Sequence, residues 1–393
     1  MSILTVNCGS STLKFKLFGA DGEQSLARGI VDRIGDTGSV ELTDGSGGNT
    51  VRPAAVADHK EAALWAVRTL DSTGLLEDVR AVGHRVVHGG ECFAAPAFLD
   101  TEALQEVEAL EELAPLHNGP ALAAVRAVGE AVGPQTPQVA CFDTAFHRTM
   151  PRFARLFALP RRFAAEGVMR YGFHGLSYEY VAGELRRLSP EAAAGRVIVA
   201  HLGNGASLAA LRNSESVDTT MGLTPASGVM MGTRSGDLDP GVPLHLLRSM
   251  SPGELENVLT RRSGLLGVSG TSADMRDLLR REAEDPRAAE AVELFCYGGA
   301  KAVGALAAGL GGLDALVFTG GIGEHAAAVR WRICERLRFL GVELDAQRNE
   351  HNAPVVSRDG RPVAVRVIPT DEDRMIARHT RKLLTETTGG SPK

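Results

Sequence analysis

Residues 197–241 read VIVAHLGNGASLAALRNSESVDTTMGLTPASGVMMGTRSGDLDPG. The first four are apolar and mostly β-branched, which predicts a buried strand, and a second extended segment follows from Ser207. Between them lie Gly203 and Gly205, whose missing side chains let several backbone N–H groups point at one spot. Further on, Arg234 stands among glycines and small hydroxyl residues, where its planar fork can grip a phosphate or a carboxylate. We therefore expect this stretch to hold phosphoryl groups.

A second strand–turn–strand pattern opens the chain at residues 3–18, with its turn at residues 7–12. Both copies place an apolar run, a polar residue, a glycine-bearing turn and a hydroxyl in the same order, about 190 residues apart. We interpret them as a cryptic internal duplication; the alternative is a chance likeness between two hairpins. A duplication predicts two similar halves that present their turns to a common cleft.

Hydrophobic periodicity and turn residues predict the other elements. We expect a hairpin at 37–51, strands at 79–87, 138–142, 314–319 and 364–369, helices at 55–70, 101–113, 177–188, 252–263 and 288–308, a break at 114–118, a glycine-rich connector at 264–270, a capping box at 271–274 that starts a further helix, and frayed residues at 384–393. Strands alternating with helices predict an α/β architecture with largely parallel sheets.

Composition limits the class of protein. The 393 residues suggest two domains or one large two-lobed unit, and 44% hydrophobic with 23% charged residues is typical of a globular chain. A net charge of −6 without like-charge blocks argues against a nucleic-acid or membrane-surface partner. No signal peptide is recognised, and the apolar residues 303–318 predict a buried helix and strand. Five scattered cysteines without a CxxC motif fit reduced thiols in the cytoplasm.

Several common site signatures are missing from the sequence. It has no P-loop and no nucleophile elbow, and residues 320–323 follow a strand without the full dinucleotide fingerprint. His84 and His88 have the spacing of a zinc pair, but no glutamate follows His84 and the segment reads as a strand.

Charged residues at strand ends give a positive indication. Ligands of α/β proteins bind at the carboxyl ends of strands, and Asp143 and Glu372 lie just past predicted strands. Carboxylates in this position suit Mg²⁺ held together with phosphate oxygens, although a lone aspartate is more often a cap or turn residue. Arg85 lies within a predicted strand, as a structural ion pair or as an anion ligand in a cleft.

The chain resembles the acetate kinase family. The motifs that carry the resemblance are 7–14 (NCGSSTLK), 83–91 (GHRVVHGGE), 142–147 (FDTAFH), 170–175 (RYGFHG), 201–207 (HLGNGAS), 219–241 and 318–324 (FTGGIGE). The likeness extends from the first strand to Ala377. It implies the fold of the actin, sugar kinase and heat-shock chaperone superfamily, with two duplicated ribonuclease H-like (actin-like ATPase) lobes and a nucleotide cleft between them. It also implies a reversible reaction in which ATP and acetate give ADP and acetyl phosphate.

The same resemblance implies roles for individual residues. Asn7, Ser10 and Lys14 would lie near the phosphates, with Asn7 and Glu372 at the metal, for which the resemblance implies Mg²⁺ and allows Mn²⁺. The implied catalytic residues are Asp143, Arg85, Arg234, His174 and His117. The implied nucleotide contacts are His201, Gly203, Asn204, Gly205, Asp274, Met275, Arg276, Gly320, Gly321, Ile322 and Gly323. Arg85 would also bind the substrate carboxylate, beside a methyl pocket of Val87, Leu116, Phe173 and Pro225.

Four motifs depart from the family pattern; two of them are residues 116–119, which read Leu-His-Asn-Gly in place of Leu-His-Asn-Pro, and residues 173–178, which read Phe-His-Gly-Leu-Ser-Tyr in place of Phe-His-Gly-Thr-Ser-His. The glycine-rich loop is usually followed by Glu-Asn and here by Glu324-His325, which puts the adenosine-side contact and the phosphoryl donor in question. The usual Thr-Asn-Glu-Glu reads Thr370-Asp371-Glu372-Asp373, which adds a negative charge.

The expected organisation is an N-terminal lobe of residues 1–150, a nucleotide-binding lobe of residues 151–373, and a helix at 374–393 that returns to the first lobe. The family forms homodimers, so we expect a cytoplasmic homodimer without nucleic-acid or membrane partners. A propionate or butyrate kinase would share the mechanism. A sugar or polyol kinase would need a base for a hydroxyl group, and a nucleotide-switch protein would bind ATP without an acyl acceptor.

Overall fold

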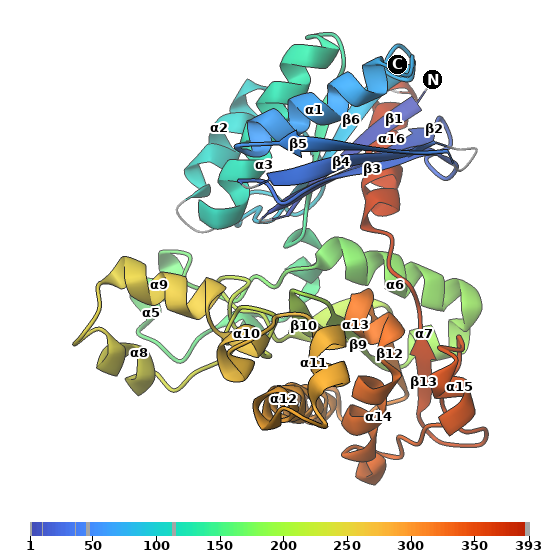
Figure 1. Ribbon diagram of the computed structural model, residues 1–393. Helices are drawn as coiled ribbons and strands as arrows, with labels where there is room; N and C mark the ends of the chain where they lie inside the picture. The colour runs from blue at the N-terminus through green and yellow to red at the C-terminus, as the bar shows by residue number, and fades with distance from the viewer. Residues whose placement is uncertain (1, 10, 36, 45–47, 112–114, 390–393) are drawn as a thin grey trace. The chain divides into compact units, whose positions relative to one another are not determined.

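The computed structural model describes residues 2–9, 11–35, 37–44, 48–111 and 115–389, without the side chains of residues 37, 52–54, 115–117 and 387–389. The chain forms two compact units (Figure 1). Unit 1 comprises Met1–Phe146 with Asp371–Lys393, and unit 2 comprises His147–Thr370.

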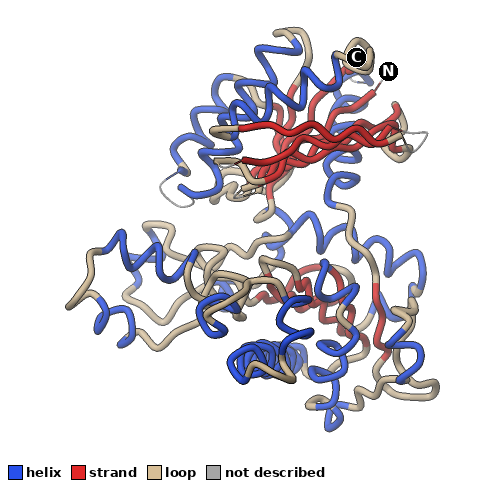
Figure 2. The backbone as a smooth tube through the Cα atoms, in the orientation of Figure 1, coloured by secondary structure: helices blue, strands red, loops and turns tan. Residues whose placement is uncertain are grey.

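Unit 1 is built on a sheet whose strands are drawn red in Figure 2. The sheet has eight strands in the order β5-β4-β3-β2-β1-β6-β8-β7. The strands are β1 (Ser2–Cys8), β2 (Thr12–Gly19), β3 (Ser25–Asp32), β4 (Thr37–Asp44), β5 (Asn49–Ala55), β6 (Val79–Val86), β7 (Ala97–Phe98) and β8 (Gln138–Phe142). Strands β1, β6 and β8 are parallel, and the other neighbours pair antiparallel. The carboxyl ends of β1, β6 and β8 therefore meet at one edge of the sheet.

Both faces of this sheet are covered near β1, as the alternation of its side chains requires. Leu4 and Val6 belong to the main core of the unit, which includes buried residues of α1 (His59–Asp71) and α3 (Pro115–Val132). Ile3 on the opposite face packs with Ala377 of α16 (Glu372–Gly389). Helix α2 (Thr101–Ala109) contributes Ala103 and Val107 to a smaller core.

Unit 2 contains a five-stranded sheet with the order β11-β10-β9-β12-β13. Its strands are β9 (Arg196–Leu202), β10 (Ala206–Arg212), β11 (Glu215–Thr219), β12 (Ala315–Thr319) and β13 (Ala364–Val367). An antiparallel meander, β9-β10-β11, is extended from β9 by two parallel strands, as β1-β2-β3 is extended from β1 by β6 and β8. The shared strand order confirms the internal duplication that the two turn motifs predict.

Unit 2 also contains short and long helices, several of which pack on its sheet. They are α4 (Arg152–Arg155), α5 (Arg161–Ala165), α6 (Gly175–Leu188), α7 (Pro190–Ala194), α8 (Gly241–Leu246), α9 (Pro252–Arg261), α10 (Gly264–Ser269), α11 (Met275–Arg281), α12 (Pro286–Leu310), α13 (Gly320–His325), α14 (Ala327–Glu335) and α15 (Ala346–Glu350), with 3-10 turns at Ala145–Thr149 and Arg338–Leu340. Within the described chain, α12 alone has the length and apolar composition of a membrane span, and half of its most apolar window is buried inside the protein.

Several sequence predictions need correction. The sheets are not largely parallel, because each contains an antiparallel meander whose strands are joined by short turns. The expected connector at 264–270 is helix α10, which Leu265 anchors in the interior. The expected break at 114–118 contains the start of α3, where Pro115 occupies a first-turn position that tolerates proline.

Two helix ends also differ from prediction. Helix α11 is capped by the Asp274 side chain, which accepts the Arg276 N–H, and Thr271 lies before the cap. The last residues were expected to fray from 384 onward, but α16 continues to Gly389.

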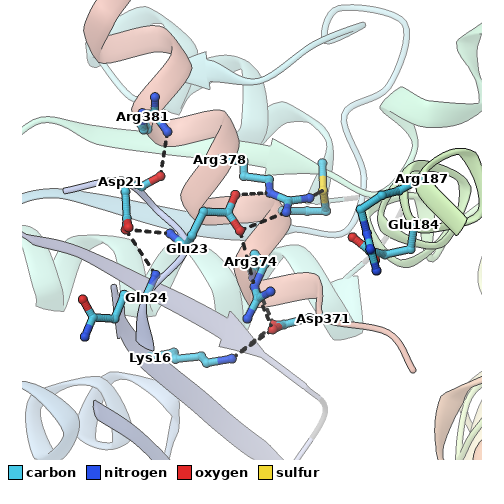
Figure 3. Close-up of polar contacts among 11 residues, drawn as sticks. Lys16, Asp21, Glu23, Gln24, Glu184, Arg187, Asp371, Arg374, Arg378 and Arg381 are labelled. Atoms are coloured by element: carbon cyan, nitrogen blue, oxygen red, sulfur yellow. Dashed lines mark hydrogen bonds and ion pairs between the residues drawn. The ribbon is translucent and has the colours of Figure 1, made fainter. Parts of the chain in front are cut away.

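Ion pairs tie α16 to the β2–β3 hairpin within unit 1 (Figure 3). The Arg378 guanidinium donates to both oxygens of Glu23 at 2.6 and 2.9 Å. Arg381 donates to the Asp21 carbonyl at 2.7 Å, and the Lys16 ammonium lies 3.1 Å from Asp371 at the base of the helix. The start of α16 is therefore fixed relative to β1 and β2.

We predict that Gly83→Ala lowers the stability of the protein by about 1–3 kcal/mol, because overpacking a close-packed contact forces atoms apart. A Cβ at Gly83 on β6 would lie 2.3 Å from the Thr380 hydroxyl and 2.5 Å from an Ile376 methyl of α16. Thermal unfolding measures the loss. Gly183→Ala in α6, where an added Cβ meets no atom within 4 Å, is the control and should be neutral or slightly stabilising. Equal stability of Gly83→Ala and the parent would contradict the close helix–strand packing.

Candidate functional site

Four polar side chains form one hydrogen-bonded cluster at the sheet edge of unit 1. Arg85 on β6 donates from Nε to both Asp143 oxygens at 3.1 and 3.2 Å, and a terminal nitrogen reaches Asp143 Oδ2 at 2.5 Å. Its other terminal nitrogen donates to Asn7 Oδ1 at 3.2 Å, and Asn7 Nδ2 donates to Glu372 Oε2 at 3.0 Å. Asn7, Arg85 and Asp143 lie at the carboxyl ends of β1, β6 and β8, and Glu372 is the first residue of α16. The parallel strands thus assemble residues far apart in sequence.

The cluster keeps its arginine charged in a largely buried setting. Burial alone would lower the pKa of Arg85, but Asp143 and then Glu372 outweigh burial and raise that pKa above its usual value. Burial raises the pKa of the neighbouring Cys8 thiol to about 12, and the opposing effect of Arg85 is smaller. Cys8 therefore stays a neutral thiol, and Arg85 remains the fixed positive charge of this edge.

The acceptor oxygens of the cluster suit a hard divalent cation. Asn7, Asp143 and Glu372 offer amide and carboxylate oxygens, which Mg²⁺ prefers, and Mg²⁺ is often held by one or two carboxylates with the rest supplied by water and phosphate. Across the residues that the structure describes, no three His, Cys, Asp or Glu side chains group into a metal site. This donor set therefore fits a metal bound jointly with a phosphorylated ligand. His84, which has the spacing of a zinc pair with His88, bonds to Gln138 at 2.7 Å.

A concentration of charge surrounds the start of α16. Lys14 on β2 is exposed, and Lys16 pairs with Asp371. Asp373 lies in a hollow of about 470 Å³ with both lysines. Burial, followed by the charge of Asp371, raises the pKa of Asp373 to about 6.

In unit 2, His174 is held against the β9–β10 hairpin. It adopts φ 58° immediately before α6, and its Nδ1 bonds to Ser207 Oγ on β10 at 2.9 Å. Its ring stacks on His201 of β9 with centroids 4.3 Å apart, and His201 Nδ1 bonds to Ser177 Oγ at 2.8 Å. Because Ser207 occupies Nδ1, the other ring nitrogen, Nε2, is the one directed to the hairpin turn, 3.2 Å from the position of a Cβ at Gly205.

Arg234 reaches the same turn from the loop between β11 and α8. A Cβ at Gly205 would lie 3.7 Å from a terminal nitrogen of Arg234, and that nitrogen donates to the Pro225 carbonyl at 3.1 Å. A Cβ at Gly232 would lie 2.0 Å from Asn204 Oδ1, so a side chain at this position would displace the Asn204 amide from the turn. The structure therefore brings together His174, the 203–205 turn and Arg234, which can surround an anion with cationic and N–H donors.

Two of the three expected nucleotide-contact stretches are adjacent. Gly320 has φ 76°, and a Cβ there would lie 2.8 Å from the Leu202 carbonyl, which places the 320–323 turn beside the β9–β10 hairpin. Gly321 is exposed and Gly323 buried. In the third stretch, Asp274 and Arg276 pair with each other at 2.7 Å on the surface, and Met275 is buried.

The expected methyl-pocket residues are apolar and closely packed where they are described. Val87, Phe173 and Pro225 are buried. Ser10 and the side chains of Leu116 and His117 lie outside the part of the chain that the structure describes.

Some supporting residues were not recognised from sequence. Ser207 accepts or donates to both His174 and the Tyr178 hydroxyl, the latter at 2.5 Å. His147 bonds to Ser216 Oγ and to the Phe173 carbonyl, and burial lowers its pKa to about 4, so it supports the 170–175 turn as a neutral ring. Ser207 stands within a glycine motif, and Tyr178 lies four residues after His174, one helical turn away. These two features of the sequence could have identified Ser207 and Tyr178 as partners of His174.

Comparison with known proteins gives concordant matches along the chain. The sequence model of the acetokinase family matches residues 2–378. The acetate kinase of Rhodopseudomonas palustris is 47% identical, over 97% of this chain and 98% of that protein. The crystal structure of Porphyromonas gingivalis acetate kinase has a TM-score of 0.88 at 38% identity and covers 98% of this chain and 99% of its own. A propionate kinase from Francisella tularensis gives a TM-score of 0.91 at 37% identity, covering 97% and 99%.

We predict that Asp373→Asn stabilises the protein at pH 7 by about 1–2 kcal/mol. The pKa of Asp373 rises on folding from 3.8 to about 6, so this carboxyl lowers the stability of the folded state progressively between these two pH values, and the loss is complete above pH 6. The gain should therefore vanish near pH 3.8. Urea unfolding between pH 4 and pH 8 measures it. Asp371→Asn, which loses the contact with Lys16, is the control and should not stabilise; a gain for Asp373→Asn that is independent of pH would contradict the prediction.

Proposed function

This chain belongs to the acetokinase family, and we propose that it catalyses reversible transfer of the γ-phosphoryl group of ATP to acetate, giving acetyl phosphate and ADP. The observation that carries the proposal is the cluster of Asn7, Arg85, Asp143 and Glu372 at the carboxyl edge of one sheet. The matching edge of the duplicated sheet carries His174, Arg234 and a glycine turn, which supports an anion-binding role there as well.

Phosphoryl transfer to a carboxylate depends on fixed positive charge more than on a general base. A carboxylate is already ionised at neutral pH, since its pKa is about 4. It must approach a negatively charged phosphoryl group, and the charge of the transition state spreads over the phosphoryl oxygens. Arg85 and Arg234 are the residues that we assign to neutralising this charge, and His174 and His117 are the assigned donors to phosphoryl oxygens.

Asp143 orients the Arg85 fork through its two oxygens. Asn7 and Glu372 are the proposed ligands of Mg²⁺, for which Mn²⁺ can substitute, and Ser10 and Lys14 contact the phosphates. The bound cation would supply charge neutralisation at the phosphate oxygens. The nucleotide contacts are those assigned by family resemblance: His201, Gly203, Asn204, Gly205, Asp274, Met275, Arg276, Gly320, Gly321, Ile322 and Gly323. The exposed His325 ring beside them can stack on a base.

The residues that we assign to the acceptor methyl group are Val87, Leu116, Phe173 and Pro225, and their apolar side chains disfavour a sugar hydroxyl as acceptor. One extra methylene changes binding by only about 1–3 kcal/mol in an apolar pocket, so propionate is the second candidate acceptor. The high structural similarity to a propionate kinase supports propionate as this second candidate.

We predict that Arg234→Ala lowers acetyl phosphate formation by about 10³-fold or more, by analogy with the effect of a transition-state arginine in other phosphoryl-transfer enzymes. Hydroxamate trapping of the acyl phosphate measures turnover with acetate, propionate and butyrate, each with ATP, another nucleoside triphosphate or pyrophosphate. Arg338→Ala, which removes an exposed arginine paired with Glu335, is the control and should turn over like the parent. Parent enzyme that forms no hydroxamate with any of these acids would end the proposal, and unchanged turnover of Arg234→Ala would end the role given to Arg234.

The protein is further assigned as a cytoplasmic homodimer. All five cysteines are free thiols, which supports a reducing compartment. Two segments of unit 2, at 153–159 and 238–247, expose large apolar side chains, including Phe153 at 81% and Leu244 at 66%. Concentrations of exposed apolar side chains are typical of protein interfaces, and these segments are the proposed contact between two copies.

Leu244→Glu should shift the protein from dimer toward monomer, because a charge would be buried at the contact. Light scattering coupled to size-exclusion chromatography gives the mass. Phe339→Glu, at an equally exposed site elsewhere in unit 2, should leave the mass unchanged. A parent protein that is monomeric, or a dimer that survives Leu244→Glu, would count against this assignment.

A further inference from the structure

One carboxylate oxygen in unit 2 accepts two backbone N–H groups that lie far apart in sequence. Glu324 Oε1 is 2.9 Å from the Gly320 nitrogen and 3.2 Å from the Thr370 nitrogen. Gly320 opens the turn directly after β12, and Thr370 follows β13. Because β12 and β13 are parallel neighbours, a single carboxylate can span their carboxyl ends.

The two amides belong to segments with different proposed tasks. Gly320 starts the 320–323 turn assigned to the nucleotide. Thr370 is the last residue of unit 2, and the chain continues within two residues to Glu372, a member of the cluster in unit 1. Glu324 thus connects the nucleotide turn to the start of the segment that carries Glu372.

The backbone around Glu324 is bound by a buried arginine. The fully buried Arg330 of α14 donates to the carbonyls of Gly323 and Glu324 at 2.9 and 3.0 Å. Its other nitrogens donate to oxygens of Asn349 and Asn352. A guanidinium at the carboxyl end of a short helix compensates its unpaired carbonyls. The backbone of Glu324 is therefore anchored by Arg330, while its side chain contacts Thr370.

The segments that Glu324 joins each contain a buried threonine hydroxyl group. The hydroxyl oxygens of Thr319, which precedes Gly320, and of Thr370 are both buried, and no hydrogen-bond partner for either is found among the described residues. Leaving a buried hydroxyl without a partner is unfavourable.

We propose that Glu324 is a positioning residue that couples occupancy of the nucleotide turn to the placement of residues 370–372, and hence of Glu372. This inference rests on the proposed function, which places nucleotide at the turn. A ligand that shifts the turn shifts Gly320 and α13, and the shared oxygen carries Thr370 with them.

The test compares the full chain with Glu324→Ala and Glu324→Gln by amide hydrogen exchange, with and without ADP and Mg²⁺. In the parent, the nucleotide should slow exchange both at the 320–323 turn and at residues 368–374. In Glu324→Ala the first effect should remain and the second should disappear. Glu324→Gln keeps an oxygen that can accept both amides, so it should restore much of the second effect.

Turnover supplies a second readout. For Glu324→Ala, kcat should fall about tenfold to a hundredfold while the KM for ATP changes much less, because a small misplacement of a catalytic group costs about this much in rate. Glu335→Ala, which removes an exposed carboxylate of α14 paired only locally with Arg338, is the matched control and should behave as the parent does. Where Glu324→Ala does not fold, Glu324→Asp replaces it; the side chain is one carbon shorter and should also lose the coupling.

The possible failures are distinct. If ADP slows exchange nowhere in the parent and no hydroxamate forms, the proposed function fails. If ADP protects both segments equally in the parent and in Glu324→Ala, or if kcat is unchanged, the coupling role of Glu324 is overturned although the function stands.

Discussion

The ion pair between Arg85 and Asp143 is the contact on which the candidate site of unit 1 depends. Two charges removed from water are stable only with good geometry and with their remaining hydrogen-bonding capacity used. Here a forked contact, Asn7 on one side of Arg85, and Glu372 beyond Asn7 meet that condition. Removing any one of them would leave a buried polar group without its partner, so the four side chains act as one preorganised surface.

The duplicated sheet gives each unit one edge at which polar groups gather, and the two edges carry different groups. In each unit a meander is extended by parallel strands from its first strand, and parallel strands end at the same edge. Unit 1 uses this edge for an arginine and acceptor oxygens, and unit 2 uses it for a glycine turn with a stacked histidine pair. The same backbone plan therefore carries different chemistry, because side chains at the strand ends are free of the packing that fixes the strand centres.

Connections between secondary structure elements carry as much of the organisation as the strands do. Helix α16 begins with Glu372 and is held on β6 by the close approach at Gly83 and on the β2–β3 hairpin by Arg378 and Arg381. On the N-terminal side of α16, Glu324 accepts the Thr370 N–H, and the buried Arg330 binds the turn after β12. Glu372 is thereby tethered from both directions along the chain.

The sequence by itself determined the strand–turn–strand repeat, most strand positions and the candidate residues at strand ends, because apolar periodicity and glycine turns are local signals. It did not determine strand direction throughout the sheets, the helical state of residues 264–269 or the start of α3, which depend on packing. The family resemblance alone placed Asn7 and Glu372 at one metal, and the sequence could not show that Asn7 donates to Glu372, 365 positions away, or that Glu324 joins Gly320 to Thr370. Only the tertiary structure decides such pairs, since sheet order, rather than sequence spacing, sets which strand ends become neighbours.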